Sequence, residues 1–480
     1  MDGLSNADLA PTSPAQRTWG LWHFAALWVG MSVCIPTYML AASMIASGLV
    51  WWESLGIILL GNAIVLLPML ATGHAGTRYG IPFPVFARAS YGVRGAHLPA
   101  LLRSLVACGW FGIQTWIGGL AISALAGAVW PGWAELGGGA RFMGHGMPEF
   151  LGFFLFWLLN LYFVWNGTES IKWLESLAAP FLIATGLALL GWAAAKAGGI
   201  APLLAASERM TGAPAARGAG FVTGVFVPWL TAMVGYWATL ALNIPDFTRF
   251  ARTQRDQAVG QALGLLTTMP LFAFIGIAVT GATLLVWGEA IWNPVDLLAR
   301  LSDRSGNPLL GILALVVLVV ATLTTNIAAN VVSSANSFSN LAPGRVSART
   351  GGLIAAAIGV LLFPWLLLDR YQTWLISYSG LLGAVGGVVV CDYLVVRRCR
   401  LELGDLYRRD GRYGYRGGIH HGAIAATLAG ALVALCGKLV PGLEVLWNGA
   451  WFSAGVVSFV AYLVLMRNHE APAVSTEAAA

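Results

Sequence analysis

Residues 309–330 read LLGILALVVLVVATLTTNIAAN and carry no charge over a length that can cross a lipid bilayer. The first twelve of these residues have no polar side chain, whereas strands of a membrane barrel are about ten residues long and alternate in polarity. The segment is therefore predicted to be a membrane-spanning helix. Its second half carries five hydroxyl and amide side chains among apolar neighbours. Such groups either hold helices together or bind a ligand, and both interpretations are open here.

Similar apolar segments recur through the 480 residues, of which 58% are hydrophobic and only 10% charged. The predicted fold class is an all-α membrane protein with about twelve transmembrane helices in one domain. These spans are expected near residues 22–47, 51–71, 99–129, 149–167, 172–195, 220–244, 258–287, 309–333, 350–368, 372–396, 421–440 and 446–467. Residues 1–20 lack the pattern of a secretory signal and are expected to form a tail, and residues 468–480 are expected to be disordered.

The placement of positive charge predicts the topology. With both termini in the cytoplasm, nineteen of the 27 Lys and Arg residues fall on the inner side and eight on the outer side. We therefore expect a multi-pass protein of a bacterial-type inner (plasma) membrane. This orientation accounts for the net charge of +6, so no nucleic-acid-binding face is needed. The Arg-rich segment 397–416 is interpreted as a solvated, lipid-facing anchor.

Two of the predicted spans are interrupted in their apolar pattern. The first contains Cys34-Ile35-Pro36-Thr37, and the sixth contains Pro228 and the pair Gly235-Tyr236. The two spans are five helices apart, and broken helices at matching positions are typical of transporters built from inverted repeats with a site at the midplane. Ordinary proline kinks are the alternative.

Aromatic and amide side chains lie close to these interruptions. Trp110 and Gln114 are one helical turn apart in the third span, and Trp237 follows the break in the sixth. Asn326 and Asn330 form a second pair at i,i+4. Two indoles with amides suit a flat ring that carries alternating N–H and C=O groups. Packing within the core or at the membrane interface is the alternative for any single tryptophan.

The polar groups of the eighth span also suggest a bound ion. No acidic or basic residue falls in the middle third of any predicted span, and a proton-driven carrier usually needs an embedded titratable group. Sodium can instead be held by neutral hydroxyl and carbonyl oxygens. The predicted sodium ligands are Gly30, Val33, Ala321, Thr324 and Thr325. Proton coupling remains an alternative, because His23 or Asp246 could titrate near the membrane boundary.

Several motifs in order resemble one family of membrane carriers. They are GIPFPVFAR at 80–88, YGVRG at 91–95, WFGIQTW at 110–116, Thr324-Thr325-Asn326 with Asn330, and DYLVVRR at 392–398. Over about residues 18–467 the chain resembles the nucleobase:cation symporters, which carry nucleobases, hydantoins, allantoin and related vitamins. The resemblance implies two inverted five-helix repeats (LeuT-like) plus two C-terminal helices, working by alternating access. On this basis the repeats span about 21–195 and 220–396 of a transporter domain at 21–467, and the extra helices span 421–467.

The chain is most similar to the bacterial sodium-hydantoin carrier of this family. That likeness implies that Trp110 and Trp237 sandwich the substrate ring and that Gln114, Asn330 and the backbone near Tyr236 bond its edges. It also implies the same sodium ligands as above.

Two residues depart from the hydantoin carrier. Cys34 stands where it has a glutamine that contacts substrate, and Tyr236 stands where it has a glycine. Because both positions line the pocket, the ligand is expected to differ. Residues 33–38 look like those of members that use pyrimidines, which favours uracil or a dihydropyrimidine. Allantoin or a hydantoin comes next.

The predicted function is therefore import of a small planar heterocycle coupled to sodium. A membrane-embedded enzyme is disfavoured, because the spans offer no base, nucleophile or metal cluster in the pattern that hydrolysis requires. Proton coupling and an uncoupled facilitator or channel remain alternatives. The expected partners are the substrate, the coupling ion and the lipid bilayer, with no other cofactor, no nucleic acid and a monomeric state.

Overall fold

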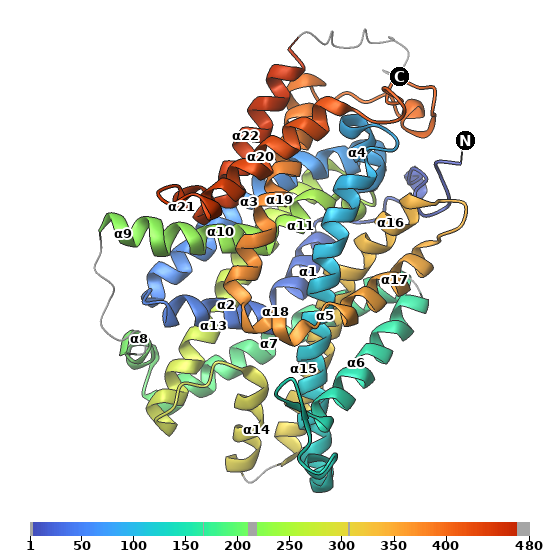
Figure 1. The fold of residues 1–480 in the computed structure, drawn as a ribbon. Helices are drawn as coiled ribbons and strands as arrows, with labels where there is room; N and C mark the ends of the chain where they lie inside the picture. Colours follow the sequence, from blue (N-terminus) through green and yellow to red (C-terminus); the bar gives the residue numbers. More distant parts are fainter. Residues whose placement is uncertain (1–2, 167, 210–217, 306–307, 468–480) are drawn as a thin grey trace.

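The computed structural model describes residues 3–166, 168–209, 218–305 and 308–467, and helices dominate throughout (Figure 1). The first half contains α1 (Leu21–Ser32), α2 (Ile35–Ala46), α3 (Trp51–Tyr79), α4 (Phe83–Tyr91), α5 (His97–Val129), α6 (Met147–Asn166), α7 (Thr168–Ala197) and α8 (Ile200–Arg209). The second half contains α9 (Ala219–Phe221), α10 (Val227–Tyr236), α11 (Ala238–Asn243), α12 (Pro245–Thr248), α13 (Gln254–Trp287), α14 (Pro294–Ser305), α15 (Pro308–Asn326), α16 (Val332–Leu341), α17 (Ala348–Leu361), α18 (Pro364–Asp369), α19 (Tyr371–Val390), α20 (His421–Leu439), α21 (Glu444–Asn448) and α22 (Ala450–Leu465).

Shorter elements join or interrupt these helices. Three are π-helical turns, η3 (Val222–Phe226), η4 (Ile327–Val331) and η5 (Cys391–Val396). Three are 3-10 turns, η1 (Pro14–Gln16), η2 (Pro131–Glu135) and η6 (Gly404–Tyr407). The strands β1 (Arg141–Phe142) and β2 (His145–Gly146) form one small antiparallel hairpin.

Within the described residues, eight helices are long and apolar enough to cross a membrane, and ten spans result if each bent pair counts as one. The bent pairs are α1 with α2, at 57°, and a second pair in which α8 follows the end of α7 at 86°. The helices α17 and α22 are also apolar but shorter. The prediction of an all-helical, multi-span membrane protein is confirmed, with two of the twelve expected spans represented by these shorter helices.

Both predicted interruptions are breaks in the helices. Val33 and Cys34 separate α1 from α2, and Pro36 lies in the first turn of α2, where its missing N–H would have no helical partner in any case. In the sixth span Trp237 separates α10 from α11, directly after Gly235 and Tyr236. The two breaks define where backbone groups must find partners outside their own helix.

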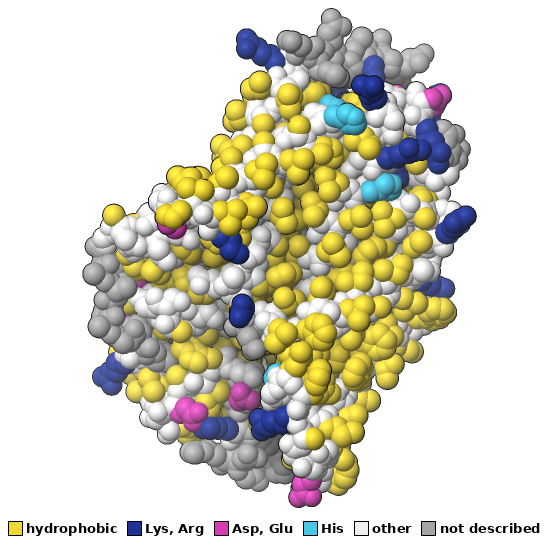
Figure 2. Space-filling view, in the orientation of Figure 1, with side chains coloured by type: hydrophobic (Ala, Val, Ile, Leu, Met, Phe, Trp, Pro, Cys, Tyr) yellow, Lys and Arg dark blue, Asp and Glu magenta, His cyan; other side chains and the backbone are white. Residues whose placement is uncertain are grey.

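The broken helices lie inside the bundle. The helix α1 packs against α13, α7 and α15, and α10 packs against α3 and α19. The first and last described segments of the chain reach the same end, which we call the terminal end (Figure 1). Lys and Arg side chains gather at that end, while hydrophobic side chains cover much of the face below it (Figure 2). This distribution suits a protein whose middle faces lipid.

At the terminal end, the N-terminal segment packs against the bundle. The Asn6 amide donates to Ser339 Oγ at 2.7 Å and to two backbone carbonyls of the loop after α16. Arg249 donates to the carbonyl oxygen of Asp8, and Arg88 donates to that of Leu4, both at 2.7 Å. Residues expected as a tail therefore tie α4, α12 and α16 together.

The Arg-rich segment differs from its prediction at its first residue. Arg397 is buried, and its guanidinium pairs with the Asp392 carboxylate at 2.7 Å. Ser90 of α4 and Tyr462 of α22 donate to the same carboxylate. The interpretation of this segment as a solvated anchor is wrong for Arg397, because a buried carboxylate requires a buried cation beside it.

Candidate functional site

A small cavity lies between the two helix breaks. Its volume is about 20 Å³, which is room for roughly one water molecule. Its lining comprises Met31 of α1, Trp110 and Gln114 of α5, Tyr236 of α10, Trp237, Thr239 and Leu240 at the break and in α11, Thr325 of α15, and Ala329 and Asn330 of η4. Five of the seven predicted substrate residues line this cavity. Cys34 and Asn326 do not.

The side chain of Tyr236 packs against both indoles. Its ring centre lies 5.1 Å from that of Trp110 and 4.7 Å from that of Trp237. Its hydroxyl lies 3.2 Å from Cys34 Sγ and 3.1 Å from Thr37 Oγ1. Cys34 therefore contacts the phenol instead of the cavity, and these contacts join the break in α1 and α2 to the break in α10 and α11.

The amide of Gln114 is available to a ligand. This side chain is 2% exposed, it faces the cavity, and its oxygen accepts no hydrogen bond in the described structure. A buried amide oxygen without a donor is costly, so an N–H group entering the cavity would be stabilised there.

The two asparagines of the eighth span have different surroundings. Asn326 donates to Phe111 O, Thr115 Oγ1 and Asn160 Oδ1 at 3.1–3.3 Å, on the side away from the cavity. Asn330 donates to Asn326 Oδ1 at 2.9 Å and lines the cavity. The π-helical turn η4 closes wider i to i+5 bonds, which rotates Asn330 toward the face of Thr325.

The helix α19 covers the cavity on the side opposite the terminal end. Tyr378 donates to Gly235 O at 2.9 Å and accepts a bond from Trp110 Nε1 at 3.0 Å. Tyr371 donates to Pro36 O at 3.1 Å. No sequence motif marked these tyrosines, although their spacing of seven places both on one face of the helix.

The predicted ion ligands also come together. Thr325 Oγ1 lies 2.7 Å from Gly30 O and 3.0 Å from Ala321 O, and Thr324 Oγ1 lies 2.9 Å from Ala321 O. Val33 packs in the same apolar cluster as Ala321. Gly30 belongs to the last turn of α1, where carbonyl oxygens lack helical partners and carry partial negative charge.

A buried cation lies beneath the cavity toward the terminal end. Arg103 is fully buried, and it donates to Asn243 Oδ1 at 2.9 Å, to Ser334 Oγ at 3.2 Å and to Ala329 O at 3.2 Å. Ala329 lines the cavity, so this one residue separates the Arg103 guanidinium from the site.

Comparison with known proteins places the chain in a family. A family model described as a permease for cytosine/purines, uracil, thiamine and allantoin matches residues 11–453. The chain belongs to this permease family. It is 41% identical to the purine-uracil permease NCS1 of Arabidopsis thaliana, over 96% of this chain and 78% of that protein.

Two further permeases extend the comparison. The allantoin permease of Bacillus subtilis (strain 168) is 40% identical over 99% of this chain and 95% of its own length. The solved structure of Mhp1, a nucleobase-cation-symport-1 family transporter, in a closed conformation with bromovinylhydantoin bound, is 26% identical with a TM-score of 0.76, over 97% of this chain and 95% of that one. The family resemblance inferred from the motifs is confirmed, as are the LeuT-like helical fold and the assignment to transporters instead of enzymes. The expectation that the chain is most similar to a hydantoin carrier is wrong, because the hydantoin permease of Microbacterium maritypicum is 30% identical over 88% of this chain, less than the purine-uracil and allantoin permeases above.

Proposed function

We propose that this permease imports a small planar cyclic ureide together with sodium by alternating access. The observation that carries this proposal is the unpartnered Gln114 oxygen in a cavity walled by two indoles. Indole faces stack on a flat ring, and an amide matches the alternating N–H and C=O groups on the edge of such a ring. In this role Trp110, Trp237, Gln114 and Asn330 contact the substrate, while Asn326 positions Asn330 and Cys34 positions Tyr236.

The small site favours uracil or a dihydropyrimidine as the substrate. Tyr236 leaves about 20 Å³ of free space, so even a single six-membered ring requires the phenol to move, and a ring with a long substituent requires more. Allantoin is the second candidate, and the 40% identity to an allantoin permease over nearly the whole of both chains supports it. A hydantoin follows, on the likeness to Mhp1.

Sodium is the proposed coupling ion. The hydroxyls of Thr324 and Thr325 converge with the carbonyls of Gly30 and Ala321 at the end of a half-helix, which is where related folds hold their cations. An ion there would take these oxygens, with that of Val33, as ligands, and the hydroxyl protons would turn away. For protons, the supporting observation is Asp246, which is buried with one carboxylate oxygen unpartnered.

Uptake of labelled uracil into proteoliposomes tests the proposal. We expect accumulation that follows an imposed sodium gradient at fixed pH and voltage, and competition by dihydrouracil and allantoin. Thr325→Ala should lower sodium-stimulated uptake by at least ten-fold, because it removes one ligand, and Thr325→Ser should retain it. Uracil uptake that is unchanged when choline replaces sodium, and that is lost in Asp246→Asn, would favour proton coupling. Equilibration without accumulation would indicate a facilitator.

The proposed orientation, repeat boundaries and oligomeric state rest on the likeness to the family. The terminal end is proposed to face the cytoplasm of a bacterial-type cell, which would place the charge-rich surface inside. The repeats are proposed to divide at about 21–195 and 220–396, with 421–467 outside them. The unit is proposed to act as a monomer.

A further inference from the structure

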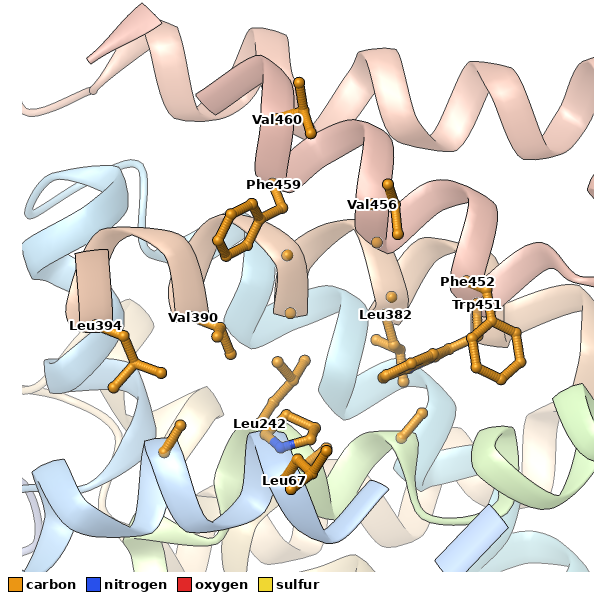
Figure 3. A pocket seen from close by; sticks show the side chains of 18 residues that line it. Leu67, Leu242, Leu382, Val390, Leu394, Trp451, Phe452, Val456, Phe459 and Val460 are labelled. Atoms are coloured by element: carbon orange, nitrogen blue, oxygen red, sulfur yellow. The ribbon is translucent and has the colours of Figure 1, made fainter. Parts of the chain in front are cut away.

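An apolar groove lies on the opposite face of α11 from the substrate cavity. Its volume is about 330 Å³, and it is formed by α3, α11, α19, η5 and α22 (Figure 3). None of its lining residues is charged or polar. Figure 3 shows Leu67 and Leu242 pointing into it from one side and Val456 and Phe459 standing on the other. In a membrane protein such a groove would be filled by an acyl chain.

Small residues create this space. A Cβ at Gly383 would come 2.6 Å from the backbone oxygen of Trp451, so that glycine serves close packing of α19 on α22. A Cβ at Gly386 would meet only a methyl group of Leu242, at 3.8 Å, which is ordinary contact. Gly386 therefore leaves room that a ligand can use.

Positive charge marks one end of the groove. Leu67, Ala71 and Arg78 follow one face of α3, and the exposed Arg78 lies in the last turn of that helix, at the terminal end. His74 Nδ1 lies 2.8 Å from Tyr393 Oη, and Tyr79, next to Arg78, donates to Cys399 O at 2.9 Å, so this end of α3 contacts Tyr393 and Cys399. Those residues are the neighbours of Leu394, which lines the groove, and of the exposed Arg398.

We propose that this groove binds one acyl chain of an anionic phospholipid whose phosphate lies at Arg78 and Arg398. Lipid tails gain little by moving from bulk lipid to another apolar surface, so the tail alone gives no selectivity. The headgroup must supply it, and each basic residue at a membrane surface contributes about a five-fold preference for an anionic lipid. The bound chain would lie against Ala238 and Ala241, directly after the break at Trp237.

Native mass spectrometry of the delipidated full chain tests this site without depending on transport. The protein is incubated with an equimolar mixture of dioleoyl phosphatidylglycerol and dioleoyl phosphatidylcholine. We expect one retained lipid, with phosphatidylglycerol preferred, and an about five-fold weaker preference in Arg78→Gln. The matched control is Arg255→Gln, which removes an exposed arginine from α13, a helix that does not line the groove.

Filling the groove tests its apolar part. Gly386→Leu should lose the retained lipid, whereas Gly56→Leu, at an exposed and open position of α3, should keep it. Ala71→Leu fills the same groove and replaces Gly386→Leu if that variant does not fold. Equal retention of both lipids, retention of phosphatidylglycerol by both groove-filling variants, or a dimer that these variants convert to monomers would overturn the proposal.

Discussion

The Tyr236 ring packs against both Trp110 and Trp237, and its hydroxyl is held by Cys34 and Thr37. On the proposed binding mode, a substrate ring that stacks on both indoles displaces this phenol, which breaks both hydroxyl contacts. Part of the binding free energy is then spent on moving the tyrosine, and the size of the accepted ring depends on how far the phenol moves.

Removing the hydroxyl of Tyr236 should make substrate binding tighter. In Tyr236→Phe the aromatic ring remains but the hydroxyl bonds are lost, while Cys34 and Thr37 can still bond each other at 3.4 Å. Because one such bond contributes about 1 kcal/mol, we expect the Kd for uracil to fall by about five-fold. Quenching of tryptophan fluorescence measures this affinity. The control is Tyr162→Phe, at an exposed position of α6, which should leave it unchanged.

Tyr236→Gly extends the same prediction to specificity. The extra space should admit hydantoins with large substituents that do not fit beside the phenol, at a stability cost of about 3–5 kcal/mol for the lost buried aromatic ring and about 1 kcal/mol more for a helical glycine. Unchanged uracil affinity in Tyr236→Phe, together with continued rejection of large rings by Tyr236→Gly, would show that the phenol is not displaced by substrate.

The sequence predicted five of the residues that meet at this cavity but not how Tyr236 is placed. Trp110 and Gln114 share a helix face, so their convergence follows from local spacing. The direction of the Tyr236 ring is set by Cys34 and Thr37, which lie about two hundred residues earlier in the chain. Local rules give no such partner, and for that reason the space expected for substrate is occupied by protein.

At the level of elements, α19 joins the two broken helices through hydroxyl groups. Tyr371 bonds Pro36 O, in the first turn of α2 after the first break, and Tyr378 bonds Gly235 O, in the last turn of α10 before the second. Both bonds hold α19 against the breaks, and the bond to Gly235 O also pairs a carbonyl at the C-terminal end of a helix. Movement of α19 would break both bonds and open the site from the side opposite the terminal end.

Loss of the Tyr378 hydroxyl should loosen this cover. Tyr378→Phe leaves Gly235 O and Trp110 Nε1 without their shared partner, which costs about 1–3 kcal/mol for buried groups. We expect Cys34, which is 2% exposed, to react at least five-fold faster with N-ethylmaleimide. Peptide mass spectrometry follows the reaction in a background where Cys399 and Cys436, the more accessible thiols, are serine.

Ser377→Ala serves as the control for that measurement, because Ser377 lies on the same helix and bonds only within it. Its Cys34 should react as in the parent. Equal reactivity in Tyr378→Phe and the parent would mean that α19 does not limit access to the break.

The two helix breaks and the π-helical turn η4 differ in how clearly the sequence predicts them. Pro36 and Gly235-Tyr236 marked the two interruptions correctly, since proline and glycine act through local backbone chemistry. The π-helical turn η4 had no such marker, because Ile327 to Val331 is compatible with an ordinary helix. The tyrosines of α19 were missed for another reason: their partners are backbone carbonyls of distant helices, and a sequence does not show which carbonyls folding brings beside a given side chain.

In the molecule as a whole, the two ends of the bundle are closed by different chemistry. The end covered by α19 uses hydroxyls and carbonyls, whereas the terminal end uses buried charge and the N-terminal segment. Hydropathy predicted the spans, and the placement of Lys and Arg along the chain predicted that arginines gather at one end. It could not distinguish the buried Arg397 from its solvated neighbours, because burial of a cation depends on a carboxylate brought close by folding.

The Asp392–Arg397 pair is expected to hold the terminal end together. Burial alone would lower the pKa of Arg397, but the Asp392 carboxylate raises it above its ordinary value, so the guanidinium stays charged. Arg397→Ala leaves a buried carboxylate unpaired, which should cost about 3–5 kcal/mol and lower the unfolding temperature measured with a thiol-reactive dye. The double variant Asp392→Asn, Arg397→Gln removes both charges and should recover much of that loss.

The exposed pair Arg300 and Glu289 provides the matched control, since Arg300→Ala should cost less than about 1 kcal/mol. A double variant no more stable than Arg397→Ala would show that the arginine acts through its contacts with Ala89 O and Tyr415 instead of through charge.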